Sequence, residues 1–267
     1  MIEYLGHLMT TEARVCPDCG DPCYKDIEIL NSETGEMMPV RMKAICGCEA
    51  QRRKNEESIL EKKKREMRTK LLRDRYLPEV RLRGFTFQAD DSPNTQASTM
   101  CRQYVDRWQT AKEKGYGLLL HGSVGTGKTF YAACIVNALI DQGIAAELTT
   151  ITRLINTIAI EDRDVELAKL NRLPLIVLDD LGAERQTDYG REMAFTIIDE
   201  RVKAKKPLIV TTNLSPAEMV KTENMGQVRT YERVLEACPI RVALTGRSRR
   251  MRDDKANVDK AMNDLFG

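Results

Sequence analysis

The sequence has no run of 18 or more apolar residues, which excludes a transmembrane helix. Its first residues lack the basic stretch followed by an apolar stretch that a secretory signal needs, so we expect a cytoplasmic protein without a membrane partner. An internal repeat and low-complexity segments are also absent. The 267 residues are enough for one full domain and a second, small one.

The sequence also has no large excess of charge of one sign, because it contains 42 lysines and arginines and 40 acids, which gives a net charge of only +2. This balance hides a local asymmetry. Residues 51–83 carry thirteen lysines and arginines against six acids, and residues 241–252 are also basic. Basic patches can bind phosphate backbones even when the whole chain is nearly neutral.

Residues 122–129 have the spacing G-x-x-x-x-G-K-[ST] of a phosphate-binding P-loop. Its glycines let successive backbone N–H groups turn toward one anion, Lys128 adds a charge for the β- and γ-phosphates, and the Thr129 hydroxyl suits Mg²⁺. An apolar strand precedes the loop and a helix follows it, so the helix dipole also favours phosphate. The motif predicts a site for ATP and Mg²⁺, and the alternative is a glycine-rich turn without a ligand. The predicted phosphate-binding residues are Gly122, Ser123, Val124, Gly125, Thr126, Gly127, Lys128 and Thr129.

Two apolar segments further along the chain end in polar residues suited to hydrolysis. The first, residues 175–178, is followed by Asp179 and Asp180, which is the Walker B arrangement. We predict that Asp179 holds Mg²⁺ and that Asp180 orients or deprotonates the attacking water; the alternative is a pair of acids that cap the next turn. The second, residues 208–212, is followed by Asn213. Asn213 is predicted to contact the γ-phosphate or the water, the alternative being an N-cap for the next helix.

Five of the eight cysteines lie within residues 1–50. A C-x-x-C pair, two predicted strands over 24–30 and 40–45, and a C-x-C pair form a layout similar to a zinc ribbon. Four thiolates bind Zn²⁺ tetrahedrally and can hold together a unit too small for its own core. The C-x-C spacing departs from the usual pair, Cys23 is an alternative ligand, and reduced cysteines in a partly ordered module are the alternative to zinc. The predicted ligands are Cys16, Cys19, Cys46 and Cys48.

The remaining sequence predicts an α/β fold in which strands and helices alternate around a parallel five-stranded sheet. We expect three parts, with the cysteine module at 1–50, a basic linker helix at 51–79 and an ATPase domain at 80–267. A single amphipathic helix is expected over 95–114. The scattered Cys101, Cys134 and Cys238 are expected to be small buried apolar residues. The expected strands cover residues 117–121, 145–150, 175–179, 208–212 and 240–244.

Together these motifs resemble the AAA+ ATPases, and most closely the DnaC-type helicase loaders and their relatives, the IstB transposition helpers. Residues 84–87, 229–234 and 246–250 are similar to three further segments of that group, and the resemblance covers about residues 80–252. It implies that Arg233 is an arginine finger for the ATP of a neighbouring subunit, with Arg229 as the substitute if the register differs. It also implies a sensor or DNA-binding role for Arg249. Surface salt bridges are the alternative for each arginine.

The resemblance implies a Mg²⁺-dependent ATPase that loads a replicative helicase. The cysteine module would grip the helicase, and the ATPase domains would form a ring or spiral that holds single-stranded DNA. Only twenty-one residues follow Gly246, too few for a helical lid, so a neighbouring subunit is expected to complete the ATP site. One alternative is an IstB-like transposition helper that remodels duplex DNA. Another is a binding scaffold with a vestigial ATPase, against which the intact lysine, threonine and acid pair argue.

Overall fold

The structure is a computed structural model, which describes residues 15–31, 34–160, 162–182, 187–222, 224–246, 258 and 261–266. The chain divides into two compact units, Met1–Glu66 and Met67–Gly267. Within the described ranges, no helix combines the length and the apolar character needed to cross a bilayer.

The smaller unit contains an antiparallel hairpin of β1 (Tyr24–Leu30) and β2 (Met37–Lys43), so the second strand begins and ends earlier than predicted. The register places Ile27 opposite Val40 and Ile29 opposite Met38, which gives the hairpin one mainly apolar face. The expected polar helix follows as α1 (Gly47–Tyr76), and nearly all of its side chains are exposed.

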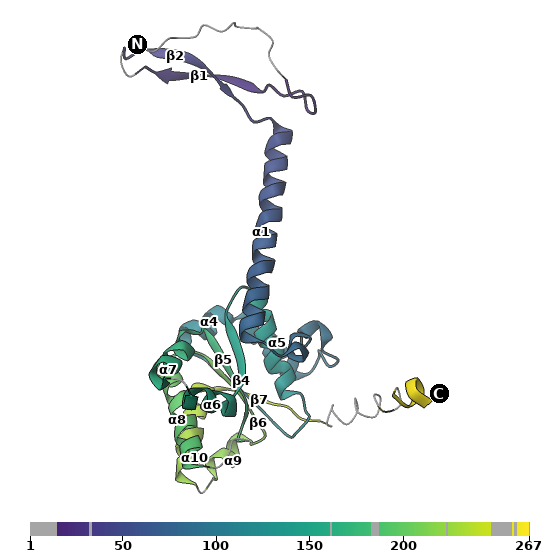
Figure 1. Cartoon of the computed structure of the whole chain (residues 1–267), viewed down its shortest axis with the longest axis vertical. Coiled ribbons are helices and arrows are strands. Elements are labelled where there is room, and N and C mark those ends of the chain that lie inside the picture. The colour runs from purple at the N-terminus through teal and green to yellow at the C-terminus, as the bar shows by residue number, and fades with distance from the viewer. Residues whose placement is uncertain are drawn as a thin grey trace. The chain divides into compact units, whose positions relative to one another are not determined.

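The larger unit (Figure 1) is built on the five-stranded parallel sheet that the sequence predicts. The order of its strands is β4-β5-β6-β3-β7. Because the strands are parallel, their carboxyl ends lie at one edge, where ligands of open α/β sheets bind. Strand β6 lies between β3, which enters the P-loop, and β5, which carries the acid pair. The strands are β3 (Leu118–His121), β4 (Ala146–Thr150), β5 (Leu175–Leu181), β6 (Leu208–Thr212) and β7 (Ile240–Ala243).

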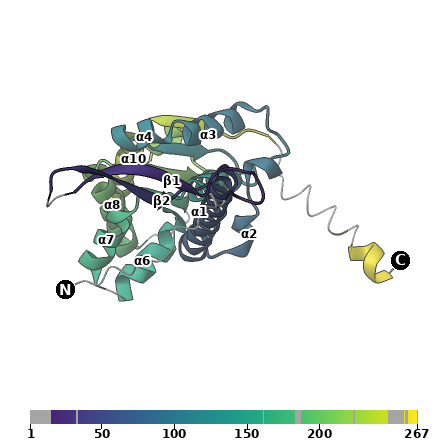
Figure 2. The same ribbon diagram turned by 90° about the horizontal axis from the view of Figure 1, so that it is seen from above.

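Helices cover both faces of this sheet, which is why its three central strands, β3, β5 and β6, begin as apolar runs. In Figure 2, α3 and α4 lie on the side opposite α6 and α7. The first core contains residues of α2 (Val80–Arg83), α3 (Gln96–Asp106), α4 (Trp108–Lys114) and α5 (Lys128–Asp141). The second contains residues of α6 (Ile151–Ile160), α7 (Arg163–Arg172), α8 (Asp188–Lys203), α9 (Pro216–Val220) and α10 (Met225–Ala237).

The prediction of one helix over 95–114 is wrong, because the chain leaves helical geometry at Arg107, where φ is −102° and ψ is 23°. The break lets Trp108 begin a new helix and pack edge-on against Tyr104, with ring centroids 6.3 Å apart. Both rings are buried in the same core. The burial of the three scattered cysteines is confirmed.

A buried arginine ties the second helical layer to the sheet. Arg201 of α8 is 1% exposed, and its guanidinium donates to the carbonyls of Leu170 and Leu173 at the end of α7. It also donates to the carbonyls of Pro174 and Pro207, which precede β5 and β6. The planar five-donor guanidinium can satisfy several such orphan carbonyls at once. Arg201 therefore fixes the entry of the two strands whose far ends carry the predicted hydrolytic residues.

Candidate nucleotide-binding and metal sites

The P-loop joins β3 to α5 and depends on glycine at its first position. Gly122 has a φ of +144°, and a Cβ there would lie 2.1 Å from the carbonyl oxygen of Leu244. No other residue fits so close an approach of two backbone segments. Gly125 and Gly127 also have positive φ, at 82° and 103°. The loop consequently ends at the N-terminus of a 14-residue helix, the geometry that binds phosphate through backbone amides and the helix dipole.

Lys128 is folded back onto this loop. Its side chain is buried, and Nζ donates to the carbonyl oxygens of Gly122 and Ser123 at 2.9 Å each. The Thr126 hydroxyl donates to the Ser123 carbonyl at 2.8 Å and closes the turn from inside. The ammonium thus lies over the loop, where bound phosphate oxygens would compete with the two carbonyls for its protons.

Thr129 and Asp179 meet across the sheet edge, although 50 residues separate them. The Thr129 hydroxyl lies 3.1 Å and 3.0 Å from the two carboxylate oxygens of Asp179. Burial raises the pKa of the Asp179 carboxyl, while the hydroxyls of Thr211 and Thr129 act in the opposite direction. A buried carboxylate beside a hydroxyl offers the hard oxygen ligands that Mg²⁺ prefers, so these two residues fit a magnesium ion.

Asp180 faces different surroundings from Asp179 because β5 contains a bulge between them. The β5–β6 pairing shifts register between Leu178 and Leu181, and Asp180 has the left-handed φ of +56°. Its side chain is exposed, whereas that of Asp179 is buried. Bulges beside active sites commonly re-aim a side chain in this way. Two adjacent acids are thereby given separate environments, one suited to a metal and one open to water.

Strand β6 contributes a residue that the sequence prediction missed. The buried Thr211 hydroxyl donates to Asp179 Oδ1 at 2.6 Å and accepts from the Asp180 amide at 2.9 Å. Two threonines in an otherwise apolar buried strand were the available signal, because a buried hydroxyl requires a partner. Asn213 follows the strand and is exposed, and its side chain has no hydrogen bond to the residues that the structure describes. The alternative role of Asn213 as a helix cap is wrong, since Ser215 caps α9.

The predicted finger lies on α10, away from the P-loop of its own chain. Ala237, at the end of α10, accepts a hydrogen bond of 2.9 Å from the Gly117 amide just before β3, whereas the P-loop follows the other end of that strand. Arg233 lies one turn before Ala237; its Nε is 3.0 Å from Asp199 Oδ1, and Nη1 donates to Glu236 at 2.6 Å. Its side chain is still 39% exposed.

Arg229, the alternative finger, lies one turn earlier on α10. Its guanidinium is 4.7 Å from the centre of the Phe195 ring, a cation–π contact. A hollow of about 330 Å³ is lined by Phe195, Arg229, Glu232, Arg233 and Glu236. Both arginines therefore border one charged depression between α8 and α10. Arg249 lies outside the described residues.

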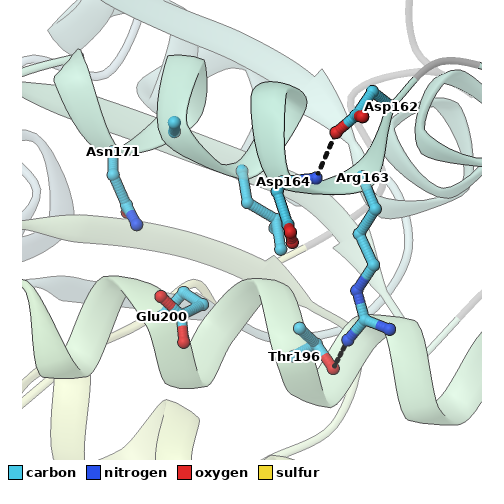
Figure 3. Close-up of a pocket in the computed structure, with 8 residues that line it drawn as sticks. Asp162, Arg163, Asp164, Asn171, Thr196 and Glu200 are labelled. Atoms are coloured by element: carbon cyan, nitrogen blue, oxygen red, sulfur yellow. Dashed lines mark hydrogen bonds between the residues drawn. The ribbon is translucent and has the colours of Figure 1, made fainter.

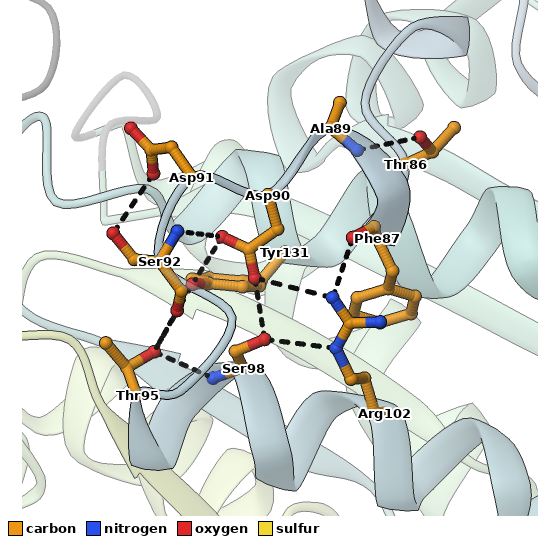
Figure 4. Close-up of polar contacts among 10 residues, drawn as sticks. All are labelled: Thr86, Phe87, Ala89, Asp90, Asp91, Ser92, Thr95, Ser98, Arg102 and Tyr131. Carbon is orange, nitrogen blue, oxygen red and sulfur yellow. Dashed lines mark hydrogen bonds and ion pairs between the residues drawn. The ribbon is translucent and has the colours of Figure 1, made fainter.

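A polar network fastens the segment before α3 to the P-loop helix (Figure 4). The Asp90 carboxylate accepts hydrogen bonds from Ser98 Oγ at 2.6 Å and from Tyr131 OH at 3.2 Å. Arg102 donates to the Phe87 carbonyl at 2.6 Å, and its guanidinium lies 4.7 Å from the centre of the Phe87 ring. Tyr131 is only two residues beyond Thr129. No sequence motif marks Asp90, so sequence analysis did not predict this anchor.

A larger polar hollow of about 750 Å³ lies between α7 and α8 (Figure 3). Its charged and polar groups are partnered locally: the Asp162 carboxylate accepts from the amides of Asp164 and Val165, and Arg163 donates to the Thr196 hydroxyl. None of its lining residues belongs to the P-loop, to the acid pair or to the end of β6. We therefore do not assign a ligand to it.

The four predicted zinc ligands converge in the smaller unit. The Sγ atoms of Cys16, Cys19, Cys46 and Cys48 all lie within 4.8 Å of one another, and Cys23 is not in this group. Two of these sulfur pairs are 3.2 Å apart. Tetrahedral zinc with Zn–S bonds of about 2.3 Å needs sulfurs about 3.8 Å apart, so the cluster fits that ion.

Charge within this cluster also favours a cation. The backbone amide of Asp18 lowers the pKa of the Cys16 thiol to about 6, and the neighbouring sulfurs of Cys46 and Cys16 raise that of Cys48. Several thiolates cannot share so small a volume without compensation, which a divalent ion supplies. The Asp21 carboxylate accepts from the Gly47 amide at 3.0 Å and ties the two cysteine pairs together.

A P-loop on a helix N-terminus, a Walker B acid pair and a parallel five-stranded sheet of this order define the AAA+ class of ATP-binding proteins. Residues 55–256 match the model of the family described as IstB-like ATP binding protein. That match covers more than half of the chain, and the chain belongs to this family.

Individual relatives fall into two functional groups. The replicative helicase loader DnaI of Bacillus subtilis (strain 168) is 31% identical over 198 residues, which are 67% of this chain and 62% of DnaI. A putative insertion sequence ATP-binding protein of Sinorhizobium fredii is 28% identical over 162 residues, 59% of this chain and 53% of that protein. The crystal structure of the DnaC helicase loader superposes with a TM-score of 0.53 at 26% identity, over 62% of this chain and all of that one. The chain thus spans 62% and 53% of the length of these two curated relatives.

Proposed function

We propose that this protein is an ATP-dependent loader of a replicative helicase. The observation that carries the proposal is the contact of Thr129 in the P-loop with Asp179 of the acid pair, in a chain whose similarity to the loader DnaI extends over 67% of its length. The cysteine module adds support, because a small metal-stabilised unit outside the ATPase core is suited to docking a particular partner.

The chemistry assigned to the site is Mg²⁺-dependent hydrolysis of ATP to ADP and phosphate. The P-loop amides and Lys128 would hold the phosphates, and Thr129 and Asp179 would hold Mg²⁺, which supplies positive charge beside the γ-phosphate when it is bound. Asp180, which is exposed at the sheet edge, orients the attacking water. Asn213 leaves β6 between the P-loop and the acid pair and contacts the γ-phosphate or that water.

Arg233 serves the ATP of a neighbouring protomer in this proposal. It lies toward the end of α10 that contacts the start of β3, whereas its own P-loop follows the end of that strand, and this supports a role at a neighbour's nucleotide. Asp199 and Glu236 hold the guanidinium in place, and its exposed part is open to a partner's phosphate. Arg229, on the same depression, is the substitute. Protomers would therefore assemble as a ring or spiral, and Arg249 would act as a sensor or DNA contact.

The N-terminal parts are assigned to partners. The four-cysteine cluster would hold Zn²⁺ and support the hairpin, whose apolar face (Ile27, Ile29, Met38 and Val40) would dock on the helicase. The linker segment 51–79 would carry this module and the ATPase domain would occupy 80–267. Single-stranded DNA would bind electrostatically in a basic channel of the oligomer, so its affinity should fall with salt.

A second candidate is an IstB-like transposition helper that remodels duplex DNA. The similarity to the insertion sequence protein of Sinorhizobium fredii favours it, since 59% of this chain is involved. The two candidates share the ATPase chemistry and differ in the client that the N-terminal module recognises.

Loading onto a closed DNA circle tests the proposal directly. A ring helicase can enter circular single-stranded DNA only if its ring is opened, and the amount retained after gel filtration measures loading. With ATP, the wild-type chain should increase helicase retention, and the Lys128→Ala variant should not. Retention equal to that of helicase alone would contradict the loader assignment. ATP-dependent binding to duplex circles without any helicase effect would favour the transposition helper.

Mixing two inactive variants tests the intersubunit site. Arg233→Ala protomers keep an intact P-loop, and Lys128→Ala protomers keep an intact finger. If Arg233 acts in trans, mixtures should recover part of the ATPase activity that each variant lacks alone. Arg229→Ala is the matched control on the same helix face. If Arg229→Ala is inactive alone and regains activity when mixed with Lys128→Ala, the arginine finger is Arg229 and not Arg233.

A further inference from the structure

We propose that Thr211 is the positioning residue that gives the two adjacent acids their separate roles. This inference rests on the proposed ATPase chemistry and adds to it a residue outside the P-loop and the acid pair. Thr211 touches neither nucleotide nor metal in this assignment; it acts through Asp179 and Asp180.

The argument begins with the pairing of β5 and β6. Residues 176–178 of β5 pair regularly with residues 208–210 of β6, and pairing resumes only between Leu181 and Thr212. Two residues of β5, Asp179 and Asp180, therefore lie opposite the single residue Thr211. This count of two against one is the definition of a β-bulge, and it leaves a backbone amide without its regular partner on the other strand.

The Thr211 side chain supplies what the bulge lacks. Its hydroxyl oxygen accepts the Asp180 amide at 2.9 Å, in place of a backbone carbonyl of β6. The same hydroxyl donates its proton to Asp179 Oδ1 at 2.6 Å. A hydroxyl has one donor and two acceptor sites, so a single group can do both. Thr211 is 0% exposed, so water does not replace it.

The consequence is a fixed difference between the two acids. Asp180 has a φ of +56°, a conformation unfavourable for residues with a side chain unless local bonds over-determine it. Held there, its carboxylate is exposed, while the Asp179 carboxylate is buried against Thr129. Without the Thr211 hydroxyl, the Asp180 amide loses its acceptor, and the Asp179 carboxylate loses one of its two hydroxyl donors. The hydrogen bonds that hold the two acids in place are therefore lost together.

Neighbouring Thr212 provides a matched control. It is also 0% exposed, but its hydroxyl donates to the Leu181 carbonyl at 2.9 Å and accepts from the Leu214 amide at 3.2 Å. Its bonds are therefore to backbone alone. Replacement of either threonine by valine removes one buried hydroxyl from the same strand at nearly constant volume.

The experiment compares full-length wild type with Thr211→Val, Thr211→Ser and Thr212→Val. Steady-state ATP hydrolysis gives kcat and KM, and titration with fluorescent ADP gives nucleotide affinity with and without Mg²⁺. We expect Thr211→Val to lower kcat by about tenfold to hundredfold. This is less than the roughly 10²–10⁴-fold that a general acid–base group contributes, because both acids are still present in the variant. Thr211→Ser, which retains the hydroxyl, should stay within about threefold of wild type, as should Thr212→Val. The gain in ADP affinity from Mg²⁺ should shrink only in Thr211→Val.

Two outcomes would overturn the proposal. One is a Thr211→Val protein whose kcat and Mg²⁺-dependent gain equal those of Thr212→Val, which would make Thr211 an ordinary core residue. The other is a Thr211→Ser protein as impaired as Thr211→Val, which would trace the effect to shape. Failure of the ATPase proposal looks different: wild type itself would not hydrolyse ATP. The Mg²⁺-dependent ADP affinities would still decide whether Thr211 orients Asp179.

Discussion

Replacing Arg201 by methionine should destabilise the larger unit without touching the nucleotide site. Methionine replaces the apolar stem of arginine as far as the position of Nε but lacks the guanidinium group, so it donates no hydrogen bond. The change therefore removes the four bonds from the guanidinium to the carbonyls that end α7 and precede β5 and β6, whose lengths lie between 2.7 and 3.3 Å.

The magnitude follows from two opposing contributions. Hydrogen bonds to a charged group contribute roughly 1.5–3 kcal/mol each, so four of them amount to roughly 6–12 kcal/mol. Removing a buried charge recovers several kcal/mol of desolvation, and burial indeed lowers the pKa of Arg201 to about 10. The expected net loss is about 2–4 kcal/mol, because four buried carbonyls lose a charged donor. Of these, Leu170 keeps the hydrogen bond from the Leu173 amide. For a unit of this size that corresponds to a fall in Tm of about 5–15 °C.

The assay is thermal unfolding followed by circular dichroism for wild type, Arg201→Met and Lys203→Met. Lys203 lies on the same helix and is 63% exposed. It pairs with Glu200 and with the buried Asp199, which keeps Arg233 as a partner when Lys203 is replaced. Its loss should cost about 0–1 kcal/mol. If Arg201→Met melts at the wild-type temperature, the assignment of Arg201 as the tie between α7 and the sheet is refuted.

Three further changes give separate tests. Asp179→Asn should abolish ATP hydrolysis and raise the Tm of the ligand-free chain at pH 7. Burial raises the pKa of the Asp179 carboxyl in the folded chain above the ordinary 3.8. The folded state therefore loses stability as the pH rises from the unfolded pKa through the folded one, and the neutral asparagine avoids this loss. An unchanged Tm at pH 7 contradicts this. Metal analysis should find zinc bound to the chain, and its removal by a chelator should unfold the hairpin unit while the melting of the larger unit persists; a metal-free chain with an intact hairpin spectrum argues against the zinc site. Asp90→Ala should lower the free energy of unfolding by about 2–4 kcal/mol in urea, because buried hydroxyls lose their acceptor, whereas exposed Asp91→Ala should change it by less than about 0.5 kcal/mol.

The parts of the fold that follow from local pattern were predictable from the sequence. The three central strands of the sheet begin as apolar runs, because helices cover both faces, and such runs stand out between helical segments. The P-loop and the acid pair are recognisable from the spacing of their residues in the sequence. Two cysteine pairs separated by a predicted hairpin indicated a site of four thiols, and the structure brings the Sγ atoms of the same four cysteines together.

The sequence does not predict the order of the strands, and the arrangement of the candidate nucleotide site depends on that order. That β6 lies between β3 and β5 is a long-range pairing, which no local pattern encodes. As a result, Thr211 was read as part of an apolar strand, although its hydroxyl contacts both acids. The bulge at Asp180 was hidden for the same reason, since it exists only relative to the partner strand.

Buried polar anchors were the other class of residue that sequence reasoning missed. Asp90 lies in a segment with the composition of a surface turn, yet its carboxylate is enclosed by Ser98 and Tyr131 from two different helices. Arg201 lies on a helix rich in charge, and nothing in its neighbours distinguishes it from exposed arginines. In both cases tertiary packing, and not local composition, decides which polar side chain is buried.

The measurement that tests the central claim most directly is a pull-down of purified replicative helicase of the source organism on the immobilised full-length chain, with ATP, with ADP and without nucleotide. A helicase loader should retain the helicase, and the amount retained should change between ATP and ADP for wild type but not for Lys128→Ala. Absence of retention under all three conditions would contradict the claim that this ATP site serves a replicative helicase.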